Sequence, residues 1–314
     1  MFEGKNILIS GGTGSFGQAF TRHLLQEHNP TKVVILSRDD TKQHNMRQLF
    51  NDDRLRFQLG DVRELERLRL AFRGIDIVIH AASLKHVPAG ERDPWEFTKT
   101  IITGTENVCR AAIDCGVGKC LLLSTDKACM PVTLYGAAKL CAEKTFLAAH
   151  VYSAGFGSPP HFAVTRYGNV MGSRGSVIPL FRSLALAGKP LPITHSQMSR
   201  FFMLMEGAIK LVDHALRKME GGEVFIPKLP SFWVRDLASA IRSEGELVIS
   251  GIRGSEKMHE ALIAPDEARN TEDAGETFIL RQGLATVGVE QAYTSDTNEW
   301  FLTVEDLKRE LEKV

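Results

Sequence analysis

The chain has 314 residues, of which 43% are hydrophobic, so it can bury one large core or two smaller ones. Its 38 Lys and Arg residues balance 38 Asp and Glu residues, which argues against a nucleic-acid partner, since phosphates demand a basic surplus. No segment resembles a secretory leader or approaches the ~18 apolar residues of a membrane helix, so we expect a cytoplasmic protein without membrane contact. The five cysteines show no C-x-x-C spacing, so we expect reduced thiols and no metal site.

Short apolar runs alternate with longer helical patterns through the first half of the chain. The runs are continuous in Val, Ile and Leu, which is typical of strands buried on both faces of a parallel sheet. They lie at residues 6–10, 32–37, 55–60, 76–82 and 119–124, and a sixth follows at 161–167. This order predicts an α/β fold with a doubly wound parallel sheet of the Rossmann type.

The pattern changes after residue 170, where a stretch rich in Gly, Ser, Pro and Arg begins. A helical pattern near 206–219 and an apolar run at 223–227 then indicate a return to the sheet. We therefore assign residues 1–170 to a dinucleotide-binding domain that 205–230 rejoin, and 171–204 with 231–314 to a smaller substrate-binding lobe.

The first predicted strand leads directly into the turn GGTGSFG, in which Gly11, Gly14 and Gly17 open a helix. Glycines allow the backbone to approach a ligand closely, and the N–H groups of a helix N-terminus bind a pyrophosphate. The spacing is G-x-x-G-x-x-G, whereas the standard dinucleotide fingerprint is G-x-G-x-x-G. We expect the intervening Thr13, together with Ser15 and Phe16, to contact the same cofactor.

The end of the second strand distinguishes between NAD and NADP. The strand ends in Ser37 and Arg38, with Lys42 shortly after, and a hydroxyl with two cations suits a 2′-phosphate. We therefore predict NADP, although Asp39 or Asp40 could instead bind the ribose hydroxyl of NAD. The remaining expected cofactor contacts are Asp61 and Val62 at the adenine, then Ala81, Ala82, Ser124, Tyr135 and Lys139.

Tyr135 and Lys139 are four residues apart on a predicted helix, so both side chains lie on one face. An ammonium beside a phenol lowers the pKa of the phenol, and the phenolate is a usable base. Ser124 or Thr125, at the end of the fifth strand, could bind the same substrate hydroxyl. This pattern predicts proton removal from an alcohol while hydride passes to a nicotinamide.

Several segments together resemble a known family. They are GGTGSFG, SRDDTKQ, GDVRE, HAASLKHVP, LSTDKA, YGAAK, RYGNVMGSRGSV, PIT, MSRF, GGEVFIPKLPS and GIRGSEKMHE. The chain is similar to the extended short-chain dehydrogenases/reductases, and within them to the inverting UDP-N-acetylglucosamine 4,6-dehydratases. The resemblance covers nearly the whole chain and implies NADP, a UDP-sugar substrate and a homo-oligomer of two or six chains.

The resemblance also implies a reaction sequence. Oxidation of the sugar at carbon 4 acidifies the hydrogen on carbon 5, water is lost across carbons 5 and 6, and hydride returns to carbon 6. Elimination needs a base and an acid, and we assign Lys127 as the base and Asp126 as the acid, with the reverse assignment left open. Thr125, Tyr135 and Lys139 complete the expected catalytic set.

The resemblance further implies a set of substrate contacts and leaves His86 with a structural role. Three departures bear on sugar specificity: Ile101 where an Asn is usual, His195 where an Asp is usual, and no proline near Gly254. The alternatives are a nucleotide-sugar 4-epimerase, a 5,6-dehydratase, or a non-catalytic NADP-binding regulator. The expected substrate contacts are Lys85, Asn169, Val177, Thr194, Arg200, Arg253 and Glu256.

Overall fold

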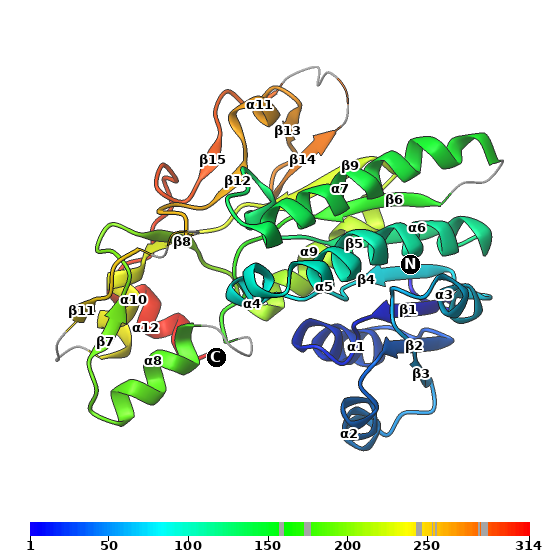
Figure 1. Ribbon diagram of the computed structural model, residues 1–314, viewed down its shortest axis with the longest axis horizontal. Helices are drawn as coiled ribbons and strands as arrows, with labels where there is room; N and C mark the ends of the chain where they lie inside the picture. The colour runs from blue at the N-terminus through cyan, green and yellow to red at the C-terminus, as the bar shows by residue number, and fades with distance from the viewer. Residues whose placement is uncertain are drawn as a thin grey trace.

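The computed structural model describes residues 1–156, 160–172, 177–242, 247–252, 254, 256–281, 283 and 288–314. Its centre is a nine-stranded sheet in the order β13-β14-β9-β6-β5-β4-β1-β2-β3 (Figure 1). The strands are β1 Asn6–Ser10, β2 Lys32–Ser37, β3 Leu55–Leu59, β4 Ile77–His80, β5 Lys119–Leu123, β6 His161–Thr165, β9 Glu223–Pro227, β13 Thr271–Asp273 and β14 Thr277–Arg281.

The seven strands from β3 to β9 are parallel, which confirms the predicted doubly wound sheet. Their apolar runs are buried because helices cover both faces. Helices α1 (Ser15–Glu27) and α9 (Met205–Lys218) pack together on one face. On the other face α3 (Leu65–Phe72), α6 (Gly104–Asp114) and α7 (Leu134–Ser153) lie side by side, and α2 (Asp40–Phe50) follows β2.

The order of the strands reverses between β1 and β4, where the chain turns from one half of the sheet to the other. In open parallel sheets, ligands bind in the crevice outside the carboxyl ends of the strands at this point. The carboxyl ends of β1, β2, β4 and β5 carry most of the predicted cofactor turns, so the topology brings these turns together.

The connection from β4 to β5 is helical but irregular. It consists of α4 (Val87–Arg92), α5 (Pro94–Thr98), a π-helical turn (Lys99–Thr103) and α6. Ile101 is buried within the π-helical turn, and its carbonyl accepts a hydrogen bond from the Thr105 hydroxyl at 2.6 Å. Ile101 therefore fills core space at the position where the resembling family carries an amide.

The rest of the chain forms small sheets and helices beside the carboxyl ends of the strands (Figure 1). A separate apolar cluster there includes Ile178, Phe202, Phe232, Leu237 and Leu307. The elements are α8 Val177–Leu186, β7 Leu191–Ile193, β8 Ser199–Phe201, β10 Ser231–Trp233, α10 Val234–Ile241, β11 Leu247–Ile249, β12 Ala261–Ile263, α11 Pro265–Ala268, β15 Tyr293–Thr294 and α12 Val304–Leu311; two short 3-10 turns lie at Asp126–Ala128 and Ala154–Phe156.

Strand β9 pairs with β6, as the sequence predicted for residues 205–230. Strands β14 and β13 extend the same sheet, with antiparallel pairing, although the sequence pattern places their residues in the smaller lobe. The division into two lobes stays a prediction. Among the described residues, no helix is long and apolar enough to cross a lipid bilayer.

Candidate functional site

The glycine turn after β1 lies tightly against the end of β4. Gly11 has φ +67°, and a Cβ placed on it would lie 2.7 Å from the Cα of Ala82. A Cβ on Gly17 would lie 2.4 Å from the carbonyl oxygen of Gly12, so the first turn of α1 also requires glycine. The turn is therefore a backbone-lined cradle beside Ala81 and Ala82, which fits the predicted pyrophosphate site.

At the end of β2, the residues predicted to bind NADP and those that could bind NAD make different contacts. Asp39 caps α2, accepting from the Lys42 N–H at 2.9 Å, and its other oxygen pairs with Lys42 Nζ at 2.6 Å. Ser37 Oγ lies 3.0 Å from Thr13 Oγ1, directly beside the glycine turn. The Arg38 side chain is 54% exposed. Asp39 is thus used as a helix cap, whereas Arg38 can still reach a phosphate.

Asp61, predicted at the adenine, is tied into the turn after β3. Arg63 donates to Asp61 Oδ2 through Nε at 3.0 Å and Nη2 at 2.7 Å, and Arg38 Nη1 lies 3.6 Å away. Burial opposes ionisation of the Asp61 carboxyl, but the Arg63 bonds hold its pKa below the ordinary value. Val62 is buried, and its carbonyl accepts from Asn107 at 3.1 Å. Asp61 is therefore a stable carboxylate that links Arg38 to this turn.

The chemistry predicted for β5 and α7 gathers at the carboxyl end of β5. Thr133 caps α7 by accepting from the Gly136 N–H at 3.0 Å, so Tyr135 falls in the first turn. A Cβ on Gly136 would lie 2.3 Å from the carbonyl oxygen of Lys127, so α7 packs directly onto the Asp126–Ala128 turn. Lys139 Nζ donates to the Leu123 carbonyl at 2.6 Å. The Tyr-Lys pair and the Asp-Lys pair therefore belong to one site.

The expected activation of Tyr135 by Lys139 stays a prediction, since Lys139 is not among the groups that shift the pKa of Tyr135 here. Burial raises the pKa of Tyr135 to about 12, and the charge of Lys127 and the Thr125 hydroxyl are the groups that oppose this rise. Burial also lowers the pKa of Lys139 to about 8, with Glu143 opposing. The ammonium of Lys139 is directed to a backbone carbonyl, so an interaction with bound cofactor or substrate must supply the activation of the phenol.

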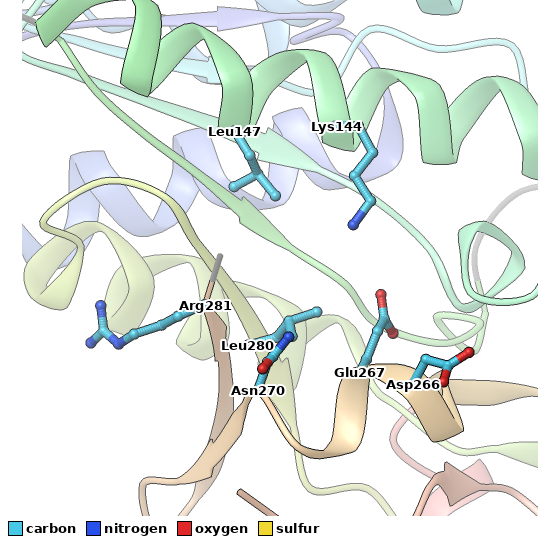
Figure 2. A pocket seen from close by; sticks show the side chains of 7 residues that line it. All are labelled: Lys144, Leu147, Asp266, Glu267, Asn270, Leu280 and Arg281. Atoms are coloured by element: carbon cyan, nitrogen blue, oxygen red, sulfur yellow. The ribbon is translucent and has the colours of Figure 1, made fainter. Parts of the chain in front are cut away.

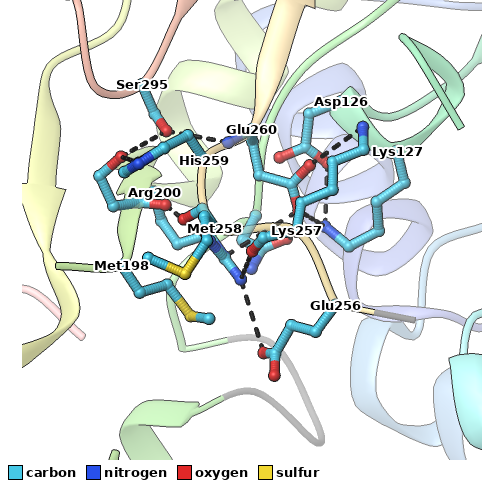
Figure 3. Close-up of polar contacts among 12 residues, drawn as sticks. Asp126, Lys127, Met198, Arg200, Glu256, Lys257, Met258, His259, Glu260 and Ser295 are labelled. Atoms are coloured by element: carbon cyan, nitrogen blue, oxygen red, sulfur yellow. Dashed lines mark hydrogen bonds and ion pairs between the residues drawn. The ribbon is translucent and has the colours of Figure 1, made fainter. Parts of the chain in front are cut away.

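Asp126 is buried and forms a close pair with the partly exposed Lys127, as Figure 3 shows. Lys127 Nζ lies 3.0 Å from Asp126 Oδ1, 3.0 Å from Asn169 Oδ1 and 3.1 Å from Glu260 Oε1. Thr125 donates to Asp126 Oδ1 at 2.9 Å. Asp126 Oδ2 is buried and accepts no hydrogen bond from any residue that the structure describes. One carboxylate oxygen is thus fixed, and the other can serve a ligand.

The surroundings of this pair shift the pKa values of both groups upward. Burial, and then the charge of Glu260, raise the pKa of Asp126 despite the attraction of Lys127. For Lys127 burial disfavours the ammonium, but Asp126 and Glu260 outweigh it and raise its pKa above the ordinary value. The upward shift of Asp126 favours transfer of a proton from Lys127 Nζ, whereas the upward shift of Lys127 opposes it.

Glu260 and Lys257 are site residues that the sequence reasoning missed. Glu260 is 3% exposed, and burial is outweighed by Lys127, Arg200 and Lys257, which lower its pKa. Lys257 Nζ lies 3.5 Å from Glu260 Oε2 and donates to the Cys129 carbonyl at 2.6 Å. Both residues stand in the segment GSEKMHE, which carried the resemblance, but only the fold brings them to Lys127.

The predicted substrate residues are only partly gathered. Asn169 contacts Lys127, as described above. Arg200 is 8% exposed and donates to the backbone carbonyls of Ser199 at 2.7 Å, Met258 at 3.0 Å and Lys257 at 3.0 Å, so it fixes the 256–260 segment. Glu256 lies 3.5 Å from Arg200. The substrate roles of both stay predictions.

The other predicted residues lie at the edge of this region. Thr194 donates to Met198 Sδ at 3.0 Å, His195 Nδ1 accepts from the Gln197 N–H at 3.1 Å, and Val177 begins α8. Lys85 is exposed just before α4, and His86 is the exposed N-cap residue of α4 without a side-chain cap bond, so its structural role stays a prediction. Arg253 lies outside the described residues.

A cavity of about 260 Å³ lies behind the site, between α7, α11 and β14 (Figure 2). Its lining includes Lys144 and Leu147 from α7 and Glu267 from α11. Glu267 also belongs to a buried cluster with Arg166, which donates to Glu267 Oε2 at 2.6 Å and to Glu143 Oε2 at 2.6 Å. No residue of the predicted site lines this cavity, so the catalytic chemistry lies elsewhere.

One group of possible metal ligands occurs in the described part of the chain, away from this site. His23, His28 and Asp213 place ligand atoms within 4.8 Å of one another. Asp213 already accepts from Arg217, at 2.6 Å to Oδ2 and 3.2 Å to Oδ1. The carboxylate is therefore neutralised by a guanidinium, which disfavours a dication at the same oxygens.

Several known proteins are similar to this chain over most of its length. An inverting UDP-N-acetylglucosamine 4,6-dehydratase of Campylobacter jejuni is 50% identical over 288 residues, which cover 91% of this chain and 86% of the relative. A UDP-glucose 4-epimerase of Rickettsia rickettsii is 40% identical over 288 residues, covering 89% and 84%. The crystal structure of Pen from Bacillus thuringiensis superposes with a TM-score of 0.92 at 36% identity, covering 100% of this chain and 99% of Pen.

These relatives confirm the resemblance that the motifs indicated, and a family profile matches residues 7–282. With most of its length covered by that profile, the chain belongs to the polysaccharide biosynthesis protein family.

Proposed function

We propose that the protein is a nucleotide-sugar 4,6-dehydratase that acts on UDP-N-acetylglucosamine, inverts carbon 5 and uses NADP. The observation that carries the proposal is the packing of the Asp126–Ala128 turn against the first turn of α7, which places an acid–base pair beside Tyr135. An oxidation site alone needs no such pair. The inverting dehydratase of Campylobacter jejuni supports the substrate and the stereochemistry.

The residues present fit a nicotinamide dinucleotide. The N-terminus of α1 follows the glycine turn directly and offers backbone N–H groups, and Arg38 is exposed beside Ser37. Ser124 Oγ is buried and has no hydrogen-bond partner among the described residues, so it is available to a ligand. When bound, the cofactor accepts hydride from carbon 4 and returns it to carbon 6. A 2′-phosphate on the ribose would pair with Arg38.

Tyr135 removes the proton of the carbon 4 hydroxyl, and Thr125 orients that hydroxyl. The phenol is buried, so its pKa of about 12 must fall when the substrate and cofactor are in place. The interaction with Lys139 that we predicted therefore belongs to the loaded site, where the lysine can exchange its bond to the Leu123 carbonyl.

Asp126 and Lys127 carry out the elimination. Lys127 passes a proton to Asp126 Oδ1 across 3.0 Å and thereby becomes a neutral amine. The amine then takes the proton from carbon 5, while Asp126 gives its proton to the departing carbon 6 hydroxyl, which leaves as water. The pair returns to its starting charge. After hydride has added to carbon 6, carbon 5 takes a proton from solvent on its opposite face, which balances the proton that Tyr135 took from the carbon 4 hydroxyl and releases to solvent. The raised pKa of Asp126 supports its role as the acid.

The test is to incubate the purified protein with UDP-N-acetylglucosamine in deuterated water and to analyse the product by mass spectrometry and NMR. We expect a 4-keto-6-deoxy product that has lost one water, with deuterium and inverted configuration at carbon 5. Tyr135→Phe should abolish every step, with a loss of about 10²- to 10⁴-fold. Lys127→Met should block water loss but still allow transient reduction of the cofactor. Retained carbon 5 configuration would contradict the proposal.

A 4-epimerase is the second candidate, because the relative from Rickettsia rickettsii with 40% identity is named as one. An epimerase would leave the carbon 6 hydroxyl in place and needs no acid for it. A product that keeps this hydroxyl, with unchanged activity in Lys127→Met, would favour the epimerase.

A further inference from the structure

Glu260 is the last residue of the 256–260 segment that Arg200 fixes. Its carboxylate faces Lys127 of the Asp126–Lys127 pair (Figure 3). Glu260 Oε1 lies 3.1 Å from Lys127 Nζ, and its other oxygen lies 3.5 Å from Lys257 Nζ. Arg200 Nε lies 3.9 Å from Glu260 Oε1. Of the three cations, Lys127 is therefore the nearest.

Glu260 is held rigidly from its own backbone. Its N–H donates to Ser295 Oγ at 3.0 Å, and Ser295 Oγ lies 2.8 Å from Ser199 Oγ. The segment before it is fixed by the bonds from Arg200 to the carbonyls of Lys257 and Met258. These bonds fix the backbone of Glu260, and at 3% exposure the residue is shielded from water.

Lys127 Nζ donates hydrogen bonds to Asp126 Oδ1 and Asn169 Oδ1 and forms an ion pair with Glu260 Oε1 at 3.1 Å. Only the contact with Asp126 belongs to the proton exchange in the proposed elimination. The other two contacts hold the nitrogen in place, and of these only Glu260 carries a charge.

We propose that Glu260 is a positioning residue for the elimination step, which holds Lys127 Nζ beside Asp126 and supplies a permanent negative charge to the pair. The inference rests on the proposed dehydratase function. Glu260 does not transfer a proton itself, because Lys127, Arg200 and Lys257 keep it ionised. Its charge raises the pKa of both Asp126 and Lys127.

This role makes a directional prediction for the pH dependence of elimination. The charged groups around the pair are Glu260, Arg200 and Lys257, with Tyr135 as the neighbouring neutral phenol. Replacing Glu260 by glutamine removes a negative charge, so the pKa values of Asp126 and Lys127 both fall. The whole pH profile of water loss should therefore move to lower pH.

The experiment compares wild type with Glu260→Gln, using Glu272→Gln as the matched control. Glu272 is an exposed carboxylate on β13, outside the site. We expect Glu260→Gln to lower kcat for water loss and carbon 5 deuterium exchange by about 10- to 100-fold. Transient reduction of the cofactor and the KM should change little. Glu272→Gln should match wild type in all of these measurements.

The possible outcomes distinguish failure of the proposed dehydratase function from failure of the proposed role of Glu260. If wild type produces no dehydrated sugar, the proposed function fails, and the role of Glu260 fails with it. If wild type dehydrates but Glu260→Gln keeps its rate and pH profile, only the role of Glu260 is overturned. If Glu260→Gln is too unstable to assay, Glu260→Asp keeps the charge and should keep the wild-type pH profile with a lower kcat. A displaced profile in Glu260→Asp would overturn the proposal.

Discussion

Removal of the Arg166 side chain should destabilise the fold far more than removal of a surface arginine. Arg166 follows β6, is 0% exposed, and donates five hydrogen bonds: two to Glu143 on α7, two to Glu267 on α11 and one to the Leu262 carbonyl. Arg166→Met leaves both carboxylates without their cation. Breaking a buried pair from one side costs about 3–5 kcal/mol, because the remaining charge is uncompensated.

The measurement is equilibrium unfolding in urea at neutral pH, together with the midpoint of thermal unfolding. For a chain of this size, the loss should lower Tm by about 6–10 °C. The control is Arg110→Met, since Arg110 is 59% exposed and lies 3.4 Å from Glu106, which is 51% exposed. Such a surface pair contributes below about 1 kcal/mol.

A second variant tests the cause of the loss. Arg166→Met combined with Glu143→Leu and Glu267→Leu removes the stranded charges, and well-packed apolar replacements of buried ion pairs are often neutral or stabilising. We expect the triple variant to recover most of the lost stability. The reasoning is refuted if Arg166→Met costs no more than the Arg110→Met control, or if the triple variant is less stable than the single one.

Two further results follow from the cofactor end and from the catalytic helix. Arg38→Ala should weaken NADP binding about 10- to 100-fold in a fluorescence titration, because a charged hydrogen bond is lost, and NAD binding should barely change; equal losses would remove the reason to prefer NADP. The pKa of Lys139 is about 8 in the folded chain and takes its ordinary value of 10.5 in the unfolded chain, so the unfolded chain binds more protons between these values. Urea unfolding of wild type relative to Lys139→Met should therefore show stability that rises with pH from about 8 to 10.5, and a flat difference would contradict the lowering of the Lys139 pKa by burial.

Most of the parallel strands could be predicted because they are continuous apolar runs, which are typical of a sheet covered on both faces; β3, with Arg56 and Gln58, is the exception. The glycine turn and the Tyr135 position followed from the same reasoning, since both stand directly after strands or at a helix start. Strands β13 and β14 were not found. Thr271–Asp273 is short and exposes two acidic residues, so its sequence resembles a loop.

The part of the site that sequence could not supply depends on contacts between distant segments. Glu260 contacts Lys127 although the two residues are far apart in the sequence, so no local spacing predicts the contact. The raised pKa of Tyr135 has a similar origin, because it depends on how deeply α7 is buried. Arg200 was predicted as a substrate contact from its motif. The fold surrounds its guanidinium with backbone carbonyls, which the motif did not indicate, and its substrate role stays a prediction.

The antiparallel hairpin of β13 and β14 also has a consequence for biosynthesis. All five residues of β9 are buried, and β9 hydrogen-bonds to β6 on one side and to β14 on the other. As the chain leaves the ribosome, the parallel strands are complete at Pro227, but the outer side of β9 stays open until Arg281 has emerged. An open apolar edge is a template for aggregation. The hairpin replaces it with β13, whose Glu272 and Asp273 discourage pairing with another chain.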